Sequence, residues 1–179
     1  MTLMPTNDPR TEPTLLTRDR FREGVFARDG HKCVICGAPG KDAHHILERR
    51  LWPDGGYYLA NGATLCADCH LKAEGTALSV EEVREAAKIT HFPLPEHLYT
   101  DQIYDKWGNP VLPDGHRLRG ELFGDESVQK VLRQYIDVDS VFRAWVKYPR
   151  TYHLPWSPGA TKDDRTLPDV SHFATPRAM

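Results

Sequence analysis

The first helical pattern of apolar residues lies near the N-terminus. Phe21 and Val25 are four residues apart and Phe26 widens their stripe, which predicts an amphipathic helix over residues 18–30. Thr17 precedes this stretch and can cap its first turn through the side-chain hydroxyl. We therefore expect one capped helix that turns its apolar stripe toward a core.

Two further amphipathic helices are expected along the chain. The stretch "SVEEVREAAKI" (79–89) begins with a capping box between Ser79 and Glu82. The stretch "ESVQKVLRQYI" (126–136) follows Asp125, which can cap it. Its apolar residues recur at positions i, i+3, i+4 and i+7 and so share one face: Val128, Val131, Leu132 and Tyr135.

Shorter elements are expected between these helices. In chain order they are a strand at 43–47, a loop at 48–58, a return strand at 63–65 and a helix at 67–74. Gly75 is suited to stop that helix. Residues 90–120 are rich in proline and glycine, so we expect irregular backbone there, with turns around 109–110 and 114–115.

Charge and hydropathy limit the classes of protein to consider. The chain has 179 residues, a formal net charge of −2, no run of eighteen apolar residues and no apolar N-terminal signal. We therefore expect a cytoplasmic protein with no membrane partner. The overall charge gives no general attraction to nucleic acid, although residues 18–50 carry eight Lys and Arg against five Asp and Glu.

The cysteines form two CxxC pairs with none left over: Cys33, Cys36, Cys66 and Cys69. In a cytoplasmic chain this pattern favours a tetrahedral thiolate zinc site. A redox CxxC motif or two local disulfides are the alternatives. Twenty-nine residues separate the pairs, whereas zinc ribbons leave about fifteen to twenty, so the zinc would clamp an inserted strand-loop-strand element.

The order of motifs in this region resembles that of the HNH endonucleases. A CxxC pair is followed by "HHI" (44–46), then by Asn61, then by "CADCH" (66–70). The resemblance runs from about Arg20 to Glu74 and implies a ββα-metal element, with two antiparallel strands and a helix around one catalytic divalent ion. We therefore expect an α+β fold, with a zinc-clamped ββα-metal (HNH) core and a mostly irregular and helical C-terminal extension.

The resemblance also implies roles for individual residues. His45 corresponds to the general base that deprotonates the attacking water, and Asn61 to the residue that ties down the loop between the strands. His44 and His70 correspond to ligands of the catalytic metal, and the four cysteines to a structural Zn²⁺ site. Helical spacing adds Glu74, one turn after His70, as a further ligand or as a residue that supports the site through water.

Elementary chemistry agrees with these roles. Imidazole has an ordinary pKa of about 6.5, which suits a base that works near neutral pH. Cys69 and His70 are successive helix residues about 100° apart, so each can face a different metal. Many relatives carry Asp in place of His44, and imidazole shifts preference away from Mg²⁺; Mg²⁺, Mn²⁺ or another divalent ion is expected.

The adjacent histidines set a geometric condition. Neighbours on a regular strand point to opposite faces. His44 and His45 therefore serve one centre only if the strand ends or bulges at that point. A regular strand through both residues counts against a shared centre.

The sequence as a whole predicts a metal-dependent HNH endonuclease that hydrolyses phosphodiester bonds in DNA, with RNA as the other candidate substrate. Arg49 and Arg50 follow the active strand and are candidates to hold phosphates. The expected organisation is a flexible arm at 1–16, a nuclease domain at 17–76, a helical and irregular extension at 77–146 and a proline-rich tail at 147–179.

Two other functions stay open at this point. A non-catalytic zinc module would bind nucleic acid, and its histidines would only pack or contact phosphate. Residues 147–165 resemble a segment near the start of some phage and bacterial RNA ligases, although the KxDG lysine motif of those enzymes is absent. This second resemblance suggests an RNA-repair accessory protein from a phage or another mobile element.

Overall fold

Helix α1 (Arg18–Arg28) begins where the sequence predicts it. The hydroxyl of Thr17 accepts a hydrogen bond from the N–H of Arg20, and Phe21 and Val25 are buried. The computed structural model describes residues 14–143. Most of the expected N-terminal arm and the whole proline-rich tail, with its RNA-ligase-like segment 147–165, lie outside the described residues.

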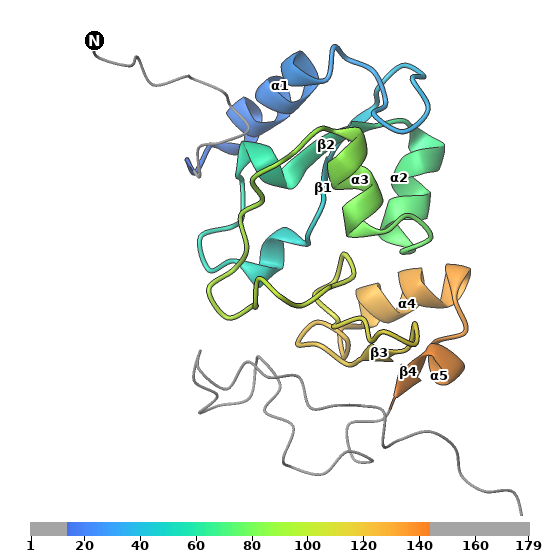
Figure 1. Ribbon diagram of the computed structural model, residues 1–179. Coiled ribbons are helices and arrows are strands. Elements are labelled where there is room, and N and C mark those ends of the chain that lie inside the picture. The colour runs from blue at the N-terminus through green and yellow to red at the C-terminus, as the bar shows by residue number, and fades with distance from the viewer. Residues whose placement is uncertain (1–13, 144–179) are drawn as a thin grey trace, which may run out of the picture.

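Strands β1 (Asp42–His45) and β2 (Gly62–Leu65) form an antiparallel hairpin. His44 pairs with Ala63 and His45 pairs with Gly62 in the ladder. Helix α1 packs against both strands, and α2 (Ala67–Glu74) contacts both as well (Figure 1). This hairpin with α2 is the expected ββα unit, so the predicted α+β class is confirmed.

The predicted first strand, 43–47, is wrong at its C-terminal end. The ladder stops at His45 because the N–H of Leu47 donates to the side-chain oxygen of Asn61, at 2.9 Å, and not to a neighbouring strand. The chain then enters a loop that holds two 3₁₀ turns, Arg49–Leu51 and Leu59–Asn61. The return strand begins one residue earlier than predicted, at Gly62.

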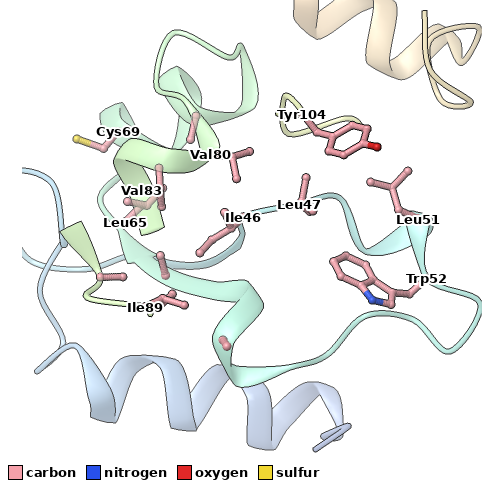
Figure 2. Close-up of a cluster of buried hydrophobic side chains, with 14 of the residues drawn as sticks. Ile46, Leu47, Leu51, Trp52, Leu65, Cys69, Val80, Val83, Ile89 and Tyr104 are labelled. Atoms are coloured by element: carbon pink, nitrogen blue, oxygen red, sulfur yellow. The ribbon is translucent and has the colours of Figure 1, made fainter. Parts of the chain in front are cut away.

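The larger apolar core lies between the hairpin, α2 and α3 (Val80–Ala86). Figure 2 shows side chains of the loop and of α3 gathered around this core, among them Ile46, Leu51 and Val83. The predicted capping box of Ser79 and Glu82 is confirmed at the start of α3. Residues as far along the chain as Tyr104 belong to the same core. The core therefore crosses residue 76, and the division into domains there stays a prediction.

A second, smaller apolar core holds together the part of the extension that follows Tyr104. Helix α4 (Glu126–Tyr135) begins at its predicted cap, Asp125, and is followed by α5 (Val138–Val141). Strand β3 (Arg117–Leu118) pairs in parallel with β4 (Phe142–Arg143). The buried members of the smaller core are Trp107, Val128, Leu132, Val138 and Phe142.

Two turns lead into β3. The second lies at the predicted residues 114–115, whereas the first was predicted too late: the N–H of Gly108 donates to Asp105 O at 3.0 Å, so the chain turns before residues 109–110. Isolated bridges join Tyr104 to Pro110 and Val111 to Arg117, so the chain reverses twice between residues 104 and 117. Within residues 14–143, no helix has the length and apolar content that a membrane crossing requires.

The contact between α1 and the hairpin gives a first prediction. A Cβ at Gly62 would lie 2.4 Å from Val25 Cγ2 and 2.7 Å from Phe21 Cζ, both in buried side chains. We expect Gly62→Ala to lower the free energy of unfolding by about 1–3 kcal/mol, because a packed core resists added volume. Urea denaturation measures this loss. Gly124→Ala is the control, because no atom lies within 4 Å of its Cβ position; equal stability of the two variants would contradict the close packing.

Candidate functional site

The first cluster of the site contains all four cysteines. Cys33 and Cys36 come from the turn after α1, whereas Cys66 and Cys69 come from the start of α2. Their sulfur atoms all lie within 4.8 Å of one another, and the thiols are free. Cys36 Sγ and Cys66 Sγ are 3.6 Å apart. Tetrahedral Zn²⁺ with bonds of about 2.3 Å would hold its sulfurs about 3.8 Å apart, so the cluster is compatible with a structural zinc site.

Backbone hydrogen bonds build the turn that carries the first CxxC pair. The N–H of Gly37 donates to Cys33 O at 2.8 Å, and Gly37 has a φ of 75°, which favours glycine. The N–H of Val34 donates to Thr64 O at 3.0 Å and ties the turn to β2. Burial raises the pKa of Cys33, but backbone groups of Cys66 and Cys36 outweigh it and lower that pKa to about 7. The backbone therefore favours the thiolate of Cys33, which is the form that binds metal, whereas the side chains of Cys33 and Cys66 raise the pKa of Cys36.

The second cluster brings together His44, His70 and Glu74. His44 lies on β1, whereas His70 and Glu74 are four residues apart on α2 and so share one face. Glu74 Oε1 is 3.3 Å from His44 Nδ1 and 3.3 Å from His70 Nε2. One donor atom from each residue lies within 4.8 Å of the others, and His44 is only 3% exposed. The donors predicted from the sequence therefore converge on one point.

The chemistry of this cluster fits a divalent cation. Burial and the nearby charge of Lys106 lower the pKa of His44 to about 3, so its imidazole is neutral. Its buried Nδ1 faces Glu74 Oε1 but has no hydrogen-bond partner among the described residues. Burial alone would raise the pKa of Glu74, but contacts with His44, His70 and Lys106 hold it well below its usual range. The hydrogen bond to Glu74 raises the pKa of His70, so this imidazole must lose its proton before it can bind a cation. Two imidazoles beside an ionised carboxylate then form a donor set for Mn²⁺, Zn²⁺ and related ions.

Asp42 supports this cluster from behind. Its Oδ2 lies 3.3 Å from Nδ1 of His70, on the opposite side of the ring from Nε2. A carboxylate at the second ring nitrogen fixes the orientation of a metal-binding histidine. The sequence analysis missed Asp42, although it is two residues before His44 on the same strand and so shares its face.

His45 points away from the second cluster. Its ring stacks on Phe21 of α1, with centroids 4.4 Å apart and planes within 10°, and Tyr57 meets it edge-on at 5.2 Å. The strand thus runs through both histidines in regular register, and their side chains lie on opposite faces. A regular strand through both residues counts against a centre shared by His44 and His45, by the condition that the sequence sets, although the ladder ends directly after His45. His45 is outside the group of three side chains that could hold a metal ion.

The surroundings of His45 keep its imidazole neutral. Burial lowers its pKa to about 4, and the charge of Lys106 acts in the same direction. Its Nε2 is buried and has no hydrogen-bond partner among the described residues. The lowered pKa keeps the ring nitrogen unprotonated near neutral pH, but it also makes the nitrogen a weaker base than the ordinary imidazole that the sequence analysis assumed.

Asn61 ties together the two ends of the loop between the strands. Its side-chain oxygen accepts from Leu47 N–H at 2.9 Å, and its amide nitrogen donates to Leu47 O at 3.0 Å and to Gly56 O at 3.4 Å. Its backbone oxygen accepts from Ile46 N–H at 2.8 Å. Asn61 is fully buried. These bonds fix the backbone directly after His45, which is the loop contact that the sequence predicted.

The two arginines of the loop differ in their surroundings. Arg50 pairs with Glu48 at 3.1 Å and with Asp125 of the extension at 2.8 Å. Arg49 is exposed, and its guanidinium lies 5.7 Å from the ring centroid of Tyr57, which also borders His45. Arg49 therefore presents its charge to solvent beside the histidine, while Arg50 links the loop to α4.

Lys106 is a second residue that the sequence analysis missed. Its ammonium group lies 3.0 Å from His45 O, 3.3 Å from Glu74 Oε1 and 3.4 Å from Glu48 Oε2. It belongs to the segment expected to be irregular, and no local pattern pointed to it. Glu48 was missed as well, because it lies at the start of a stretch that the sequence marks only as a loop.

Comparison with known families agrees with this geometry. Residues 33–75 match the family model described as HNH endonuclease. No curated protein and no solved structure matches the chain. The matched segment contains both clusters and His45, so the resemblance seen in the sequence is confirmed for this part of the chain. Members of this family are nucleases, and nucleic acid is their substrate.

The buried bonds of Asn61 give a second prediction. Asn61→Ala removes the partners of Leu47 N–H and Leu47 O in a place closed to water. We expect the free energy of unfolding to fall by about 2–4 kcal/mol, because buried backbone groups without partners are costly. Guanidinium denaturation checks this, with Gln134→Ala on the exposed side of α4 as the control. A variant as stable as that control would show that the loop does not depend on Asn61.

Proposed function

We propose that this protein is a metal-dependent HNH endonuclease that hydrolyses phosphodiester bonds in DNA. The observation that carries the proposal is the convergence of His44, His70 and Glu74 on one point, directly beside a strand end that bears the neutral imidazole of His45. This hairpin-and-helix unit lies within the segment that matches the nuclease family.

The three converging residues would hold one divalent ion. When bound, such an ion supplies positive charge that stabilises the phosphate and the leaving oxygen during cleavage. Two imidazoles and one carboxylate suit Mn²⁺ better than Mg²⁺, because Mg²⁺ prefers oxygen ligands. Asp42 would keep Nε2 of His70 directed toward the ion by holding Nδ1 on the other side of the ring.

His45 would act as the general base. Its Nε2 has no partner among the described residues and can take a proton from the attacking water. Phe21 and Tyr57 hold the ring on two sides, so it turns little and keeps its nitrogen in one direction. Asn61 would serve the reaction indirectly, by fixing the backbone after His45.

The substrate backbone would lie across the loop that follows β1. Arg49 is exposed next to Tyr57, and a guanidinium in this position suits a phosphate near the base. Arg50 would contribute to the same surface, although its ion pairs with Glu48 and Asp125 first hold the loop against α4. Both arginines would contact phosphates, and neither would recognise a nucleobase.

The four cysteines would bind a structural Zn²⁺. They join the turn after α1 to the start of α2, where His70 directly follows Cys69 and Glu74 comes one turn later. The zinc would thus set the position of the helix that supplies two of the three ligands in the second cluster.

A nicking assay tests the proposed activity. We expect the protein to convert supercoiled plasmid to open circles with Mn²⁺ and more weakly with Mg²⁺. His45→Ala should reduce the rate by at least about 10²-fold, because the water loses its base. His91→Ala, an exposed histidine away from the clusters, should cleave at the wild-type rate.

Three outcomes would contradict the proposal. Equal cleavage by wild type and His45→Ala would show that His45 is not the general base. Binding of DNA without cleavage across several divalent ions would favour a non-catalytic zinc module. Cleavage of RNA with no cleavage of plasmid would show that DNA is the wrong substrate.

Metal analysis tests the zinc. We expect about one tightly bound Zn²⁺ per chain, lost together with the fold in Cys33→Ser, because the sulfur ligands link two parts of the chain. His44→Ala is the control: it should keep the zinc and the fold but lose nicking activity. Elemental analysis and circular dichroism measure the two effects. A folded Cys33→Ser variant without zinc would mean that the cysteines do not brace the fold.

A further inference from the structure

Lys106 contacts the site from outside the family match. The match ends at residue 75, and Lys106 lies in the turn that the Tyr104–Pro110 bridge closes. The side chain is 4% exposed, yet its ammonium group reaches the backbone oxygen of His45 and the carboxylates of Glu48 and Glu74. The ammonium group of Lys106, in the extension, thus contacts both the strand end that bears His45 and the cluster that contains Glu74.

The backbone of Lys106 makes a second link to the same segment. Its carbonyl oxygen accepts a hydrogen bond from the N–H of Glu48 at 2.8 Å, while its ammonium group donates to His45 O at 3.0 Å. Lys106 therefore holds the stretch His45–Glu48 at both ends. Asn61 holds the two residues between them, Ile46 and Leu47.

The turn around Lys106 is fixed by a buried network. Asp105 accepts hydrogen bonds from the side chain of Asn109 and from the N–H of Trp107, and it pairs with Arg117 at 3.1 Å. Both Asp105 and Asn109 are buried. The turn has little freedom, so the ammonium group is held in one place.

Trp107 connects this turn to the helix of the second cluster. Its indole N–H donates to the backbone oxygen of Glu74 at 2.9 Å, and its ring belongs to the smaller core. The end of α2 therefore has its carbonyl bound by Trp107 and its carboxylate contacted by Lys106. Both residues come from the extension.

A buried ammonium group needs a reason beyond packing. Removing a charge from water is costly unless partners of opposite charge surround it, and apolar residues of the same size often stabilise a core equally well. The two carboxylates and the carbonyl around Lys106 provide such partners. Two of these partners belong to the proposed site: the Glu74 carboxylate is a proposed metal ligand, and the carbonyl belongs to His45, the proposed base.

We propose that Lys106 is a positioning residue of the active site, which holds the backbone beneath His45 in place and acts as a fixed positive charge beside Glu74. This inference rests on the proposed nuclease function and extends the site beyond the matched segment. It makes the extension a required part of the catalytic unit.

The two contacts of Lys106 predict opposite effects of its removal. Loss of the bond to His45 O lets the base move, and a misplacement of about 1 Å can cost on the order of 10²-fold in rate. Loss of the positive charge 3.3 Å from Glu74 Oε1 removes a repulsion on any cation bound there. We therefore expect a lower kcat together with divalent-ion binding that is unchanged or tighter.

The test compares wild type, Lys106→Met and the control Lys130→Met, which removes an exposed lysine of α4. For Lys106→Met, kcat for plasmid nicking at saturating Mn²⁺ should fall by about 10- to 100-fold. The Kd for Mn²⁺, measured by titration calorimetry on the zinc-loaded protein, should stay equal or decrease. Lys130→Met should match wild type in both measurements.

Several results would overturn the proposal. A wild-type kcat for Lys106→Met would show that the base does not depend on Lys106. A rise in the Kd for Mn²⁺ would show that the lysine serves to assemble the ligands. If Lys106→Met does not fold, Lys106→Gln takes its place with the same expectations, and unfolding of both variants would make Lys106 a purely structural residue.

The same experiment separates this inference from the proposed function. If wild type itself does not nick plasmid, the nuclease proposal fails. The comparison of Mn²⁺ binding between wild type and Lys106→Met still tests the fixed charge beside Glu74. If wild type nicks and Lys106→Met nicks equally fast, only the role of Lys106 fails.

Discussion

The site depends on one stretch of backbone that leaves the sheet while it is still buried. Ile46 and Leu47 follow the last ladder residue, His45, and both are in the core. Their polar backbone groups no longer have a strand beside them, and such groups need other partners inside a protein. Asn61 provides them from the far end of the loop, and Lys106 of the extension bonds the backbone of the two flanking residues, His45 and Glu48. These bonds fix the direction in which the chain leaves His45.

Alternation on one strand and rotation on one helix separate the two kinds of chemistry. On β1, His44 faces α2 and joins the second cluster, whereas His45 faces α1 and stacks on Phe21. On α2, Cys69 joins the cysteine cluster, whereas His70, the next residue, joins the cluster of His44. The members of each adjacent pair therefore face different neighbours without any irregular backbone.

Local patterns predicted most of the helices, because their causes are local. The two CxxC pairs indicated the first cluster, whereas His44 and His70 of the second cluster came from the resemblance to the HNH endonucleases. The caps at Thr17, Ser79 and Asp125 need only neighbours in the sequence. The end of β1 was predicted two residues too late, since Ile46 and Leu47 suit a strand and the bond from Leu47 to Asn61 spans fourteen residues. Lys106 lies sixty-one residues from His45, so no periodicity relates them. Asp42 was within reach of sequence reasoning, through its two-residue spacing from His44.

The extension contacts the candidate site from outside the matched segment. The larger core runs from the cysteine turn to Tyr104, and the smaller core includes Trp107, whose indole binds the last carbonyl of α2. Arg50 adds an ion pair from the loop to the cap of α4. A disturbance of the smaller core would therefore reach Glu74 through Trp107 and His45 through Lys106, its neighbour in the chain. Lys106 and Trp107, adjacent in one turn, therefore link the packing of the extension to His45 and to Glu74.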